Sequence, residues 1–252
     1  MDLSLSFYVI SIVAILTTGI SKSGFGGGLG VMAVPMMSLF AAPQLAAAVM
    51  MPILFAMDVM IVFRYRKSWN RAVVFALLPG ALIGLSLGAL FFGVLDADLI
   101  RFVIGVLALI FVAQYLLQGR KWAGKRKASK PLVWILAATS GFASYVAHAG
   151  GPPVKAYLLS QEMPKAAFVG TNTVFFFILN GLKTVAYGST GTLDWSTLYI
   201  SLILSPWLVV GVLVGSWLHS RVDQKIFVRI VYGFLALTAL RLLSTSIPTF
   251  WN

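Results

Sequence analysis

The sequence predicts an all-α integral membrane protein, a polytopic helical bundle made of two inverted repeats. Of its 252 residues, 60% are hydrophobic and only 10% are charged, whereas a soluble domain carries about a quarter charged residues. Apolar runs fill most of the chain, and two glycine-rich breaks interrupt them at similar places in the two halves. We therefore predict that each repeat is a broken, re-entrant helix pair followed by three full transmembrane helices.

The first repeat is expected over residues 1–120. A glycine run separates the two arms of its broken pair, and three apolar spans follow. Each span is about 20 residues long, which is enough to cross a bilayer. In chain order the five segments are 5–21, 29–41, 44–63, 72–93 and 99–118.

A basic linker, 121–131, is expected on the cytoplasmic side, and the second repeat follows over 132–252. Its broken pair surrounds a Gly-Gly-Pro-Pro stretch, and three full spans again complete the repeat. In chain order the segments are 132–147, 153–161, 165–187, 195–218 and 225–245.

The two halves also match residue by residue, which indicates an internal duplication. Several glycines, prolines and an arginine recur at a nearly constant offset. Pro79, Gly84 and Gly88 recur 127 residues later as Pro206, Gly211 and Gly215. Arg101 and Gly105 recur 128 residues later as Arg229 and Gly233, and Gly27-Gly28 correspond to Gly150-Gly151.

The distribution of basic loops predicts the orientation in the membrane. The 64–71 loop carries four Lys or Arg residues and its counterpart, 188–194, carries none, whereas the bias is opposite for 94–98 and 221–225. Because basic loops stay inside, the halves should be inverted and both termini outside. The alternative, eight simple crossings with both termini inside, would place the basic 221–225 loop outside.

Composition excludes several function classes. The chain has no cysteine and only two histidines, so no thiolate nucleophile, disulfide or zinc–thiolate site is expected. No phosphate-binding GxxxxGK[ST] loop is present, and no cofactor or enzymatic activity is predicted. The net charge of +12 comes from residues that flank apolar spans, which favours contact with membrane lipids over nucleic acid. The first apolar run lacks a basic n-region and a cleavage site, so we expect it to be retained.

The two breaks predict an anion-binding site at mid-membrane. A half-helix that begins there directs free N–H groups and a positive dipole end at a cavity, and prolines suit its first turn. Two such ends, near Gly28 and Pro152, would bind an anion between them. The alternative is close helix packing at small residues. The candidate substrate-binding residues are Gly26, Gly27, Gly28, His148, Gly150, Gly151, Pro152, Thr171 and Asn172.

Charged residues inside apolar segments are candidates for charge compensation or gating, because intramembrane charge is expensive. Lys22 and Lys155 flank the breaks, where they would add positive charge or extend to the interface. Lys183 and Asp58 lie deeper, and we expect them to pair as a structural lock or as a protonation-linked gate. For His148 the interpretations stay open: donation to the anion or titration during transport, or satisfaction by backbone carbonyls at the break.

The residues around both breaks resemble the signatures of the TauE/SafE family, also called the toluene sulfonate uptake permease family. The first signature is Ser23-Gly24-Phe25-Gly26-Gly27-Gly28-Leu29-Gly30-Val31 with Val34-Pro35, and the second is Ala147-His148-Ala149-Gly150-Gly151-Pro152-Pro153 with Val169-Gly170-Thr171. The resemblance covers nearly the whole chain and implies a bacterial inner-membrane permease for sulfite, organosulfonates or other small anions. The first break lacks a histidine and prolines, so the two anion-binding ends would differ chemically.

These observations predict a multi-pass secondary transporter of a small anion, sulfite or an organosulfonate, in the cell inner membrane. Alternating access would come from rocking of the two repeats. The alternatives are a small-anion channel and a transporter of small carboxylates. A coupling proton or sodium ion is compatible with the sequence, and so is a homo-oligomer. The exact substrate and the direction of transport stay open.

Overall fold

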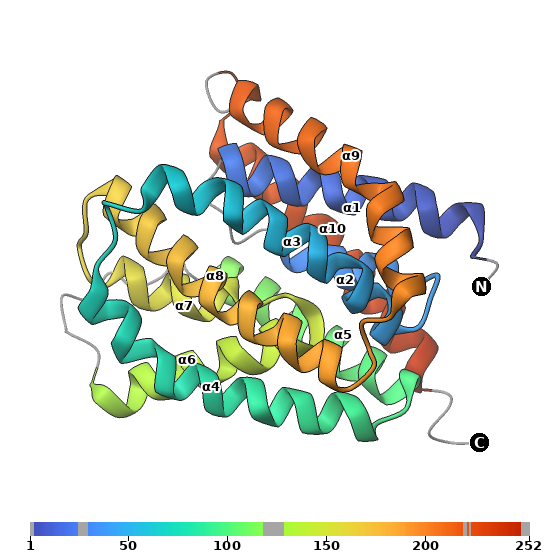
Figure 1. Ribbon diagram of the computed structural model, residues 1–252. Coiled ribbons are helices and arrows are strands. Elements are labelled where there is room, and N and C mark those ends of the chain that lie inside the picture. The colour runs from blue at the N-terminus through green and yellow to red at the C-terminus, as the bar shows by residue number, and fades with distance from the viewer. Residues whose placement is uncertain (1–2, 25–29, 118–128, 219–220, 222, 248–252) are drawn as a thin grey trace.

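The computed structural model describes residues 3–24, 30–117, 129–218, 221 and 223–247. Every regular element in these ranges is helical, as the sequence predicts (Figure 1). The first half contains α1 (Leu5–Gly24), η1 (Gly30–Met32), α2 (Ala33–Met37), α3 (Pro43–Tyr65), α4 (Arg71–Val94) and α5 (Ala97–Leu117). The second contains α6 (Lys130–Ala147), α7 (Gly151–Leu159), α8 (Lys165–Ser189), α9 (Trp195–Leu218) and α10 (Gln224–Ser246).

Seven of the described helices are long and apolar enough to cross a membrane: α1, α3, α4, α5, α8, α9 and α10. The six full spans predicted from hydropathy are among them. The seventh, α1, was expected only as one arm of a broken pair, but it runs to Gly24 and has the length and composition of a complete span. The second arm of that pair is shorter than predicted, because only η1 and the five-residue α2 are helical within 30–41.

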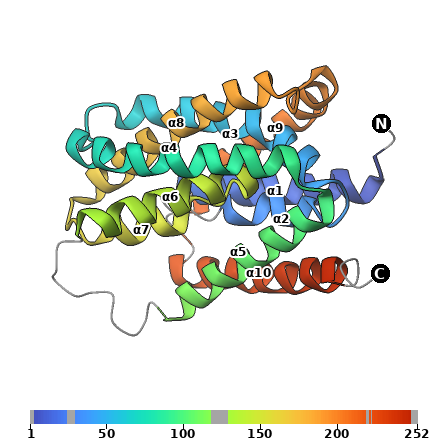
Figure 2. The same ribbon diagram turned by 90° about the horizontal axis from the view of Figure 1, so that it is seen from below.

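The long helices pack in pairs that join the two halves of the chain. α4 lies along α6, α1 along α9, α3 along α8, and α5 along α10. Figure 2 shows α5 and α10 side by side, on one side of the remaining helices. Because every one of these pairs takes one helix from each half, the halves are intertwined and share one core.

Glycines allow the closest of these approaches. A Cβ atom added at Gly80 would lie 2.6 Å from the carbonyl oxygen of Trp134, and one at Gly88 would lie 2.7 Å from the Cβ of Tyr145. The contacts advance along both helices together, so α4 and α6 run in the same direction. On α9, a Cβ at Gly215 would lie 2.6 Å from the Cα of Ile20 on α1. Small residues thus let these backbones touch, as is common in membranes.

Replacing Gly84 with valine is expected to destabilise the bundle strongly. An added Cβ would overlap the backbone of Ala138, so α4 and α6 must separate, and overpacking of this kind costs roughly 1–3 kcal/mol or more. Gly93 lies on the same helix with nothing within 4 Å of an added Cβ, so Gly93→Val is the matched control. Thermal unfolding in detergent should give a clearly lower Tm for Gly84→Val alone. Equal Tm values would mean that the α4–α6 contact is not close-packed in the folded protein.

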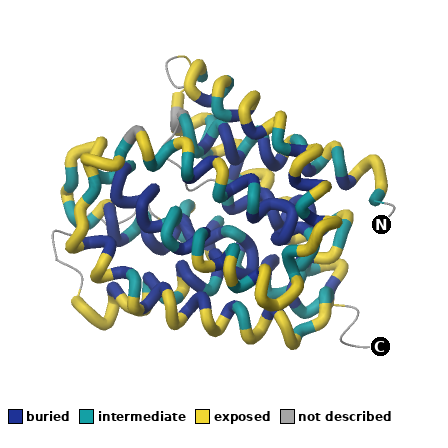
Figure 3. Tube along the Cα trace, in the orientation of Figure 1, coloured by how far each residue is buried: buried dark blue, intermediate teal, exposed yellow. Residues whose placement is uncertain are grey.

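Buried and exposed residues separate as expected for a bundle in lipid. Figure 3 shows buried positions concentrated on the inner faces of the helices and exposed positions on the outside. Many exposed side chains are large and apolar, among them Leu90, Val185 and Leu213, which are 66%, 72% and 65% exposed. A soluble monomer rarely exposes so much apolar surface in one continuous region, so this outer surface fits contact with lipid.

Polar caps mark the ends of some helices. Asn70 precedes α4 and accepts a hydrogen bond from the Val73 N–H at 3.2 Å. Before α9, Asp194 accepts from the Thr197 N–H at 2.8 Å, and its own N–H donates to the Thr197 hydroxyl at 2.9 Å. Hydrogen bonds from Thr197 and Ser196 hold the pKa of Asp194 below its usual value. Any stability that Asp194 contributes through this lowered pKa is therefore present at neutral pH and lost as the pH falls through it.

Candidate functional site

The second break lies between α6 and α7 and is buried inside the bundle. α6 ends at Ala147, and His148 adopts a left-handed conformation with φ 52°, which turns the chain. α7 begins at Gly151 with Pro152 and Pro153 in its first turn, where the missing proline N–H groups cost nothing. A helix therefore begins at the second break, as the sequence predicts, two residues earlier than expected.

Close packing on α6 fixes the start of α7. The Ser140 hydroxyl donates to the carbonyl oxygen of Gly150 at 2.7 Å. A Cβ at Gly150 would lie 2.6 Å from the carbonyl oxygen of Ser140, so only glycine fits there. Within the described part of the chain, the N–H groups of Gly150 and Gly151 have no hydrogen-bond partner. Since prolines follow, these two groups are the backbone donors that the first turn of α7 offers.

His148 connects this break to α3 and α8. Its Nε2 lies 2.9 Å from the Ala47 carbonyl oxygen, and its Nδ1 lies 2.7 Å from Lys183 Nζ. Lys183 also donates to the Ser144 carbonyl oxygen at 2.9 Å. Nδ1 also lies 3.2 Å from the Ser144 carbonyl oxygen. Where Lys183 donates to Nδ1, as an ammonium must, the ring is the tautomer with Nε2–H, which donates to Ala47. Both ring nitrogens are occupied, which favours the backbone-satisfied interpretation of His148 over donation to an anion.

Asp58 pairs with Lys22, and not with Lys183 as the sequence led us to expect. Lys22 Nζ lies 2.5 Å from Asp58 Oδ1, and the Asn180 amide donates to Asp58 Oδ2. The expected partner, Lys183, turns to His148 and Ser144 instead. The correction follows from helix register: Asn180 is the α8 residue that faces Asp58, and Lys183 lies one turn further along that helix.

The other predicted site residues are distributed around this cluster. Thr171 is buried, but its hydroxyl accepts from the Asn70 N–H at 2.9 Å, so its partner lies in the α3–α4 connection. Asn172 is 5% exposed, and its Oδ1 has no hydrogen-bond partner among the described residues. Lys155 is partly buried on α7. Gly26, Gly27 and Gly28 lie outside the described residues.

An aromatic group lies beside His148. Tyr187 is fully buried and donates its hydroxyl to the Tyr145 carbonyl oxygen at 2.6 Å. The Tyr187 ring stacks on Phe92 with centroids 5.8 Å apart and lies 6.2 Å from the imidazole of His148. These rings separate the polar cluster from the side of the bundle where α4 ends.

A comparison with models of protein families shows the family of this chain. The model of the sulfite exporter TauE/SafE family matches residues 11–242. The chain belongs to this family. No curated protein and no solved structure matches it. Membership confirms the resemblance seen at the two breaks and makes this a multi-pass membrane transport protein of a family linked to sulfur anions.

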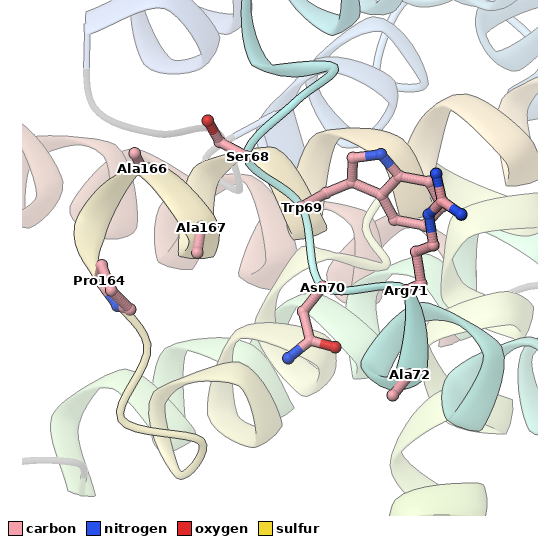
Figure 4. A pocket seen from close by; sticks show the side chains of 8 residues that line it. All are labelled: Ser68, Trp69, Asn70, Arg71, Ala72, Pro164, Ala166 and Ala167. Atoms are coloured by element: carbon pink, nitrogen blue, oxygen red, sulfur yellow. The ribbon is translucent and has the colours of Figure 1, made fainter.

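The TauE/SafE chain also carries a depression of about 620 Å³ at the end of the bundle where α4 and α8 begin (Figure 4). Figure 4 shows Arg71 beside Trp69, with the guanidinium carbon 5.6 Å from the ring centroid. The residues that line the depression are Ser68, Trp69, Asn70, Arg71, Ala72, Pro164, Ala166 and Ala167. None of these residues belongs to the polar cluster of His148, Lys183, Asp58, Lys22 and Asn180, so the depression is a separate feature.

Several partners in this TauE/SafE site were missed by sequence reasoning. The carbonyl oxygens of Ala47 and Ser144 could not be predicted from the sequence, because a residue of any type has a backbone carbonyl oxygen. Nor does any sequence pattern indicate that the Ser140 hydroxyl donates to the Gly150 carbonyl oxygen. Asn180 was not missed: the sequence places it on one polar stripe with Thr171, Asn172 and Thr173, expected to line the cavity or to hydrogen-bond to neighbouring helices. In the structure it donates to Asp58 on α3.

Proposed function

We propose that this protein is a secondary transporter of a small sulfur anion, sulfite or an organosulfonate, which binds where α7 begins. The observation that carries the proposal is the buried Lys183 ammonium, held by His148 next to a half-helix N-terminus. Lys183 and the N–H groups of Gly150 and Gly151 are donors without a carboxylate among them. The three oxygens of a sulfite or sulfonate group accept hydrogen bonds from such a set of donors.

The charge balance of the cluster supports an anion. Lys22 and Asp58 neutralise each other, and His148, which contacts Lys183, contributes no negative charge. Lys183 is fully buried and leaves one positive charge without an acidic contact in the described residues. An uncompensated buried charge costs several kcal/mol in a membrane protein, and a bound anion would remove that cost.

The packing of the bundle supports two inverted repeats. Gly84 lies against Ala138, and the equivalent residue, Gly211, lies against Leu16. Gly211 matches Gly84 at the offset of 127 residues, and Leu16 lies on α1, which holds the same place in the first half as α6 does in the second. The pairs α4–α6 and α9–α1 are therefore related by exchange of the halves, as a twofold axis through the molecule would require.

The direction of equivalent helices supports the inversion. Phe55 on α3 stacks on Phe177 on α8 with centroids 5.4 Å apart. Earlier on α8, Gly170 lies against Tyr65, later on α3. α3 and α8 are therefore antiparallel, which is the relation that inverted repeats give to equivalent helices. Rocking of such repeats around a central site would alternate its access.

The test is anion binding to purified protein, measured by thermal unfolding. Sulfite, thiosulfate, methanesulfonate, sulfate and acetate would be compared at one ionic strength, with chloride as the reference. A ligand at about a hundred times its Kd stabilises the folded state by about 2.7 kcal/mol. We expect Tm to rise with sulfite or methanesulfonate.

Gly151→Val is expected to lose this Tm shift, because a branched side chain would crowd the N–H donors at the start of α7. Gly233→Val is the matched control, since nothing lies within 4 Å of a Cβ added at Gly233 on α10. A shift with acetate alone would change the substrate class. The absence of any shift in the wild type would refute binding at α7.

A further inference from the structure

Asp58 differs from every other acidic residue of the chain. It lies in the middle of α3 and is 1% exposed. The other acidic residues, at positions 2, 96, 98, 162, 194 and 223, lie in loops, at the chain start or in the first turn of a helix. An intramembrane carboxylate is expensive to maintain and usually serves transport or proton transfer. The proposed anion site itself has no use for a negative charge, so Asp58 needs another explanation.

Asp58 lies where the two halves of the molecule cross. Asn180, which donates to it, belongs to α8 in the second half of the chain. One turn away, Phe55 of the first half stacks on Phe177 of the second. Any rocking of one half against the other must therefore change the surroundings of this carboxylate.

Four groups surround Asp58 from the elements packed around it. Lys22 on α1 and Asn180 on α8 contact it directly. Lys183 lies one turn further along α8, where it contacts the Ser144 carbonyl oxygen and His148. The groups around Asp58 are thus basic side chains and an amide. Among the described residues of this cluster, Asp58 is the one carboxylate.

The two partners of the ion pair differ in access. The Lys22 side chain is 15% exposed, whereas that of Asp58 is 2% exposed. Lys22 is therefore the partner that an anion held at α7 would draw out of the pair. When the anion takes the hydrogen bonds of Lys22, Asp58 is left as a buried carboxylate without its counter-charge, a state that protonation relieves. Asn180 fits both states, because an amide donates to a carboxylate and accepts from a carboxylic acid.

We propose that Asp58 is the proton-binding residue that couples transport, so that one H⁺ binds with each anion and both cross in the same direction. The carboxylate takes the proton from the aqueous side that supplies the anion. On the other side the anion leaves, Lys22 returns to Asp58, and the proton is released there. For a monovalent sulfonate the step moves no net charge, so a pH gradient drives it and a membrane potential does not. This inference rests on the proposed anion transport and adds its coupling ion.

The experiment uses full-length protein in liposomes and two assays with radiolabelled sulfite and methanesulfonate. Exchange against internal unlabelled anion, without a gradient, measures binding and rocking. Accumulation against a concentration gradient, driven by an imposed pH difference, measures coupling. Methanesulfonate does not titrate in the range used, so protons that move with it belong to the protein. We expect the wild type to perform both, and Asp58→Asn to exchange without accumulating.

Asp98→Asn is the matched control. Asp98 also pairs with a basic side chain, Arg101, at 2.5 Å, but its own side chain is 40% exposed. This variant should exchange and accumulate like the wild type.

The other possible results of the two assays are interpreted as follows. Accumulation by Asp58→Asn at the wild-type level overturns the proposal, and so does wild-type accumulation driven by sodium or by membrane potential alone. If Asp58→Asn also loses exchange, Asp58→Glu, which keeps a carboxylate beside Lys22, is measured in both assays. Exchange and accumulation by Asp58→Glu support coupling, whereas loss of exchange in this variant too makes Asp58 a structural residue. A wild type that exchanges no anion refutes the proposed function itself.

Discussion

Replacing Lys183 with methionine is expected to abolish anion binding and transport while the protein still folds and inserts. Lys183 is fully buried, and its ammonium contacts only His148 and the Ser144 carbonyl oxygen among the described residues. Methionine has a similar length and fills the same space without the charge. The variant removes the excess positive charge that an anion would neutralise, so uptake into liposomes should fall to the level of empty vesicles.

The stability of Lys183→Met separates a binding role from a structural lock. Removing a buried charge recovers its desolvation penalty, and an apolar replacement is often neutral or stabilising by about 1–4 kcal/mol. Against this, the Ser144 carbonyl oxygen and His148 Nδ1 each lose a donor, at roughly 1–3 kcal/mol. The two effects oppose each other, and we expect Tm to change little while transport disappears.

Lys165→Met is the control for Lys183→Met. Lys165 lies on the same helix but is exposed at its first residue, so its replacement should leave uptake and Tm close to wild type. Uptake by Lys183→Met at the wild-type rate would show that the lysine only supports the fold. A large fall in Tm together with lost uptake would favour the structural lock.

The sequence predicted the helices well because their signals are local. Long apolar runs separated by polar or glycine-rich stretches give spans whose ends agree with α3, α4 and α9 to within a residue or two. Pro152 and Pro153 correctly indicated the start of α7, since proline is favoured in the first turn of a helix. Hydropathy did not show that α1 has the length of a full span, because the polar residues in its last turn resemble a loop.

The contacts inside the site could not be predicted in the same way. Which residue of α8 faces Asp58 depends on the rotation and depth of that helix against α3, and a shift of one turn exchanges Asn180 for Lys183. The partners of His148 are backbone oxygens, including that of Ala47 from the other half. The close approach of α6 to α4 that positions His148 depends on Gly84 and Gly141, whose role appears only when the helices are packed.

Replacing His148 with glycine is expected to impair anion transport although it relieves backbone strain. His148 holds φ 52°, a conformation that costs a non-glycine residue roughly 1–2 kcal/mol. Glycine would remove that cost but also the ring that joins Lys183 Nζ to the Ala47 carbonyl oxygen. Without this support the ammonium is free to turn away from α7. A positioning loss of about 1.4 kcal/mol would weaken anion affinity about tenfold, measurable by anion titration of Tm.

Glu162→Gly provides the matched comparison for His148→Gly. Glu162 is the other non-glycine residue with positive φ among those described, at 48°, and it lies exposed in the α7–α8 connection. If the left-handed backbone were all that mattered at position 148, both variants would be slightly stabilised and both would bind anions normally. We expect only Glu162→Gly to behave in this way. If both variants bound anions with wild-type affinity, His148 would have no role in anion binding. It would then serve only to end α6.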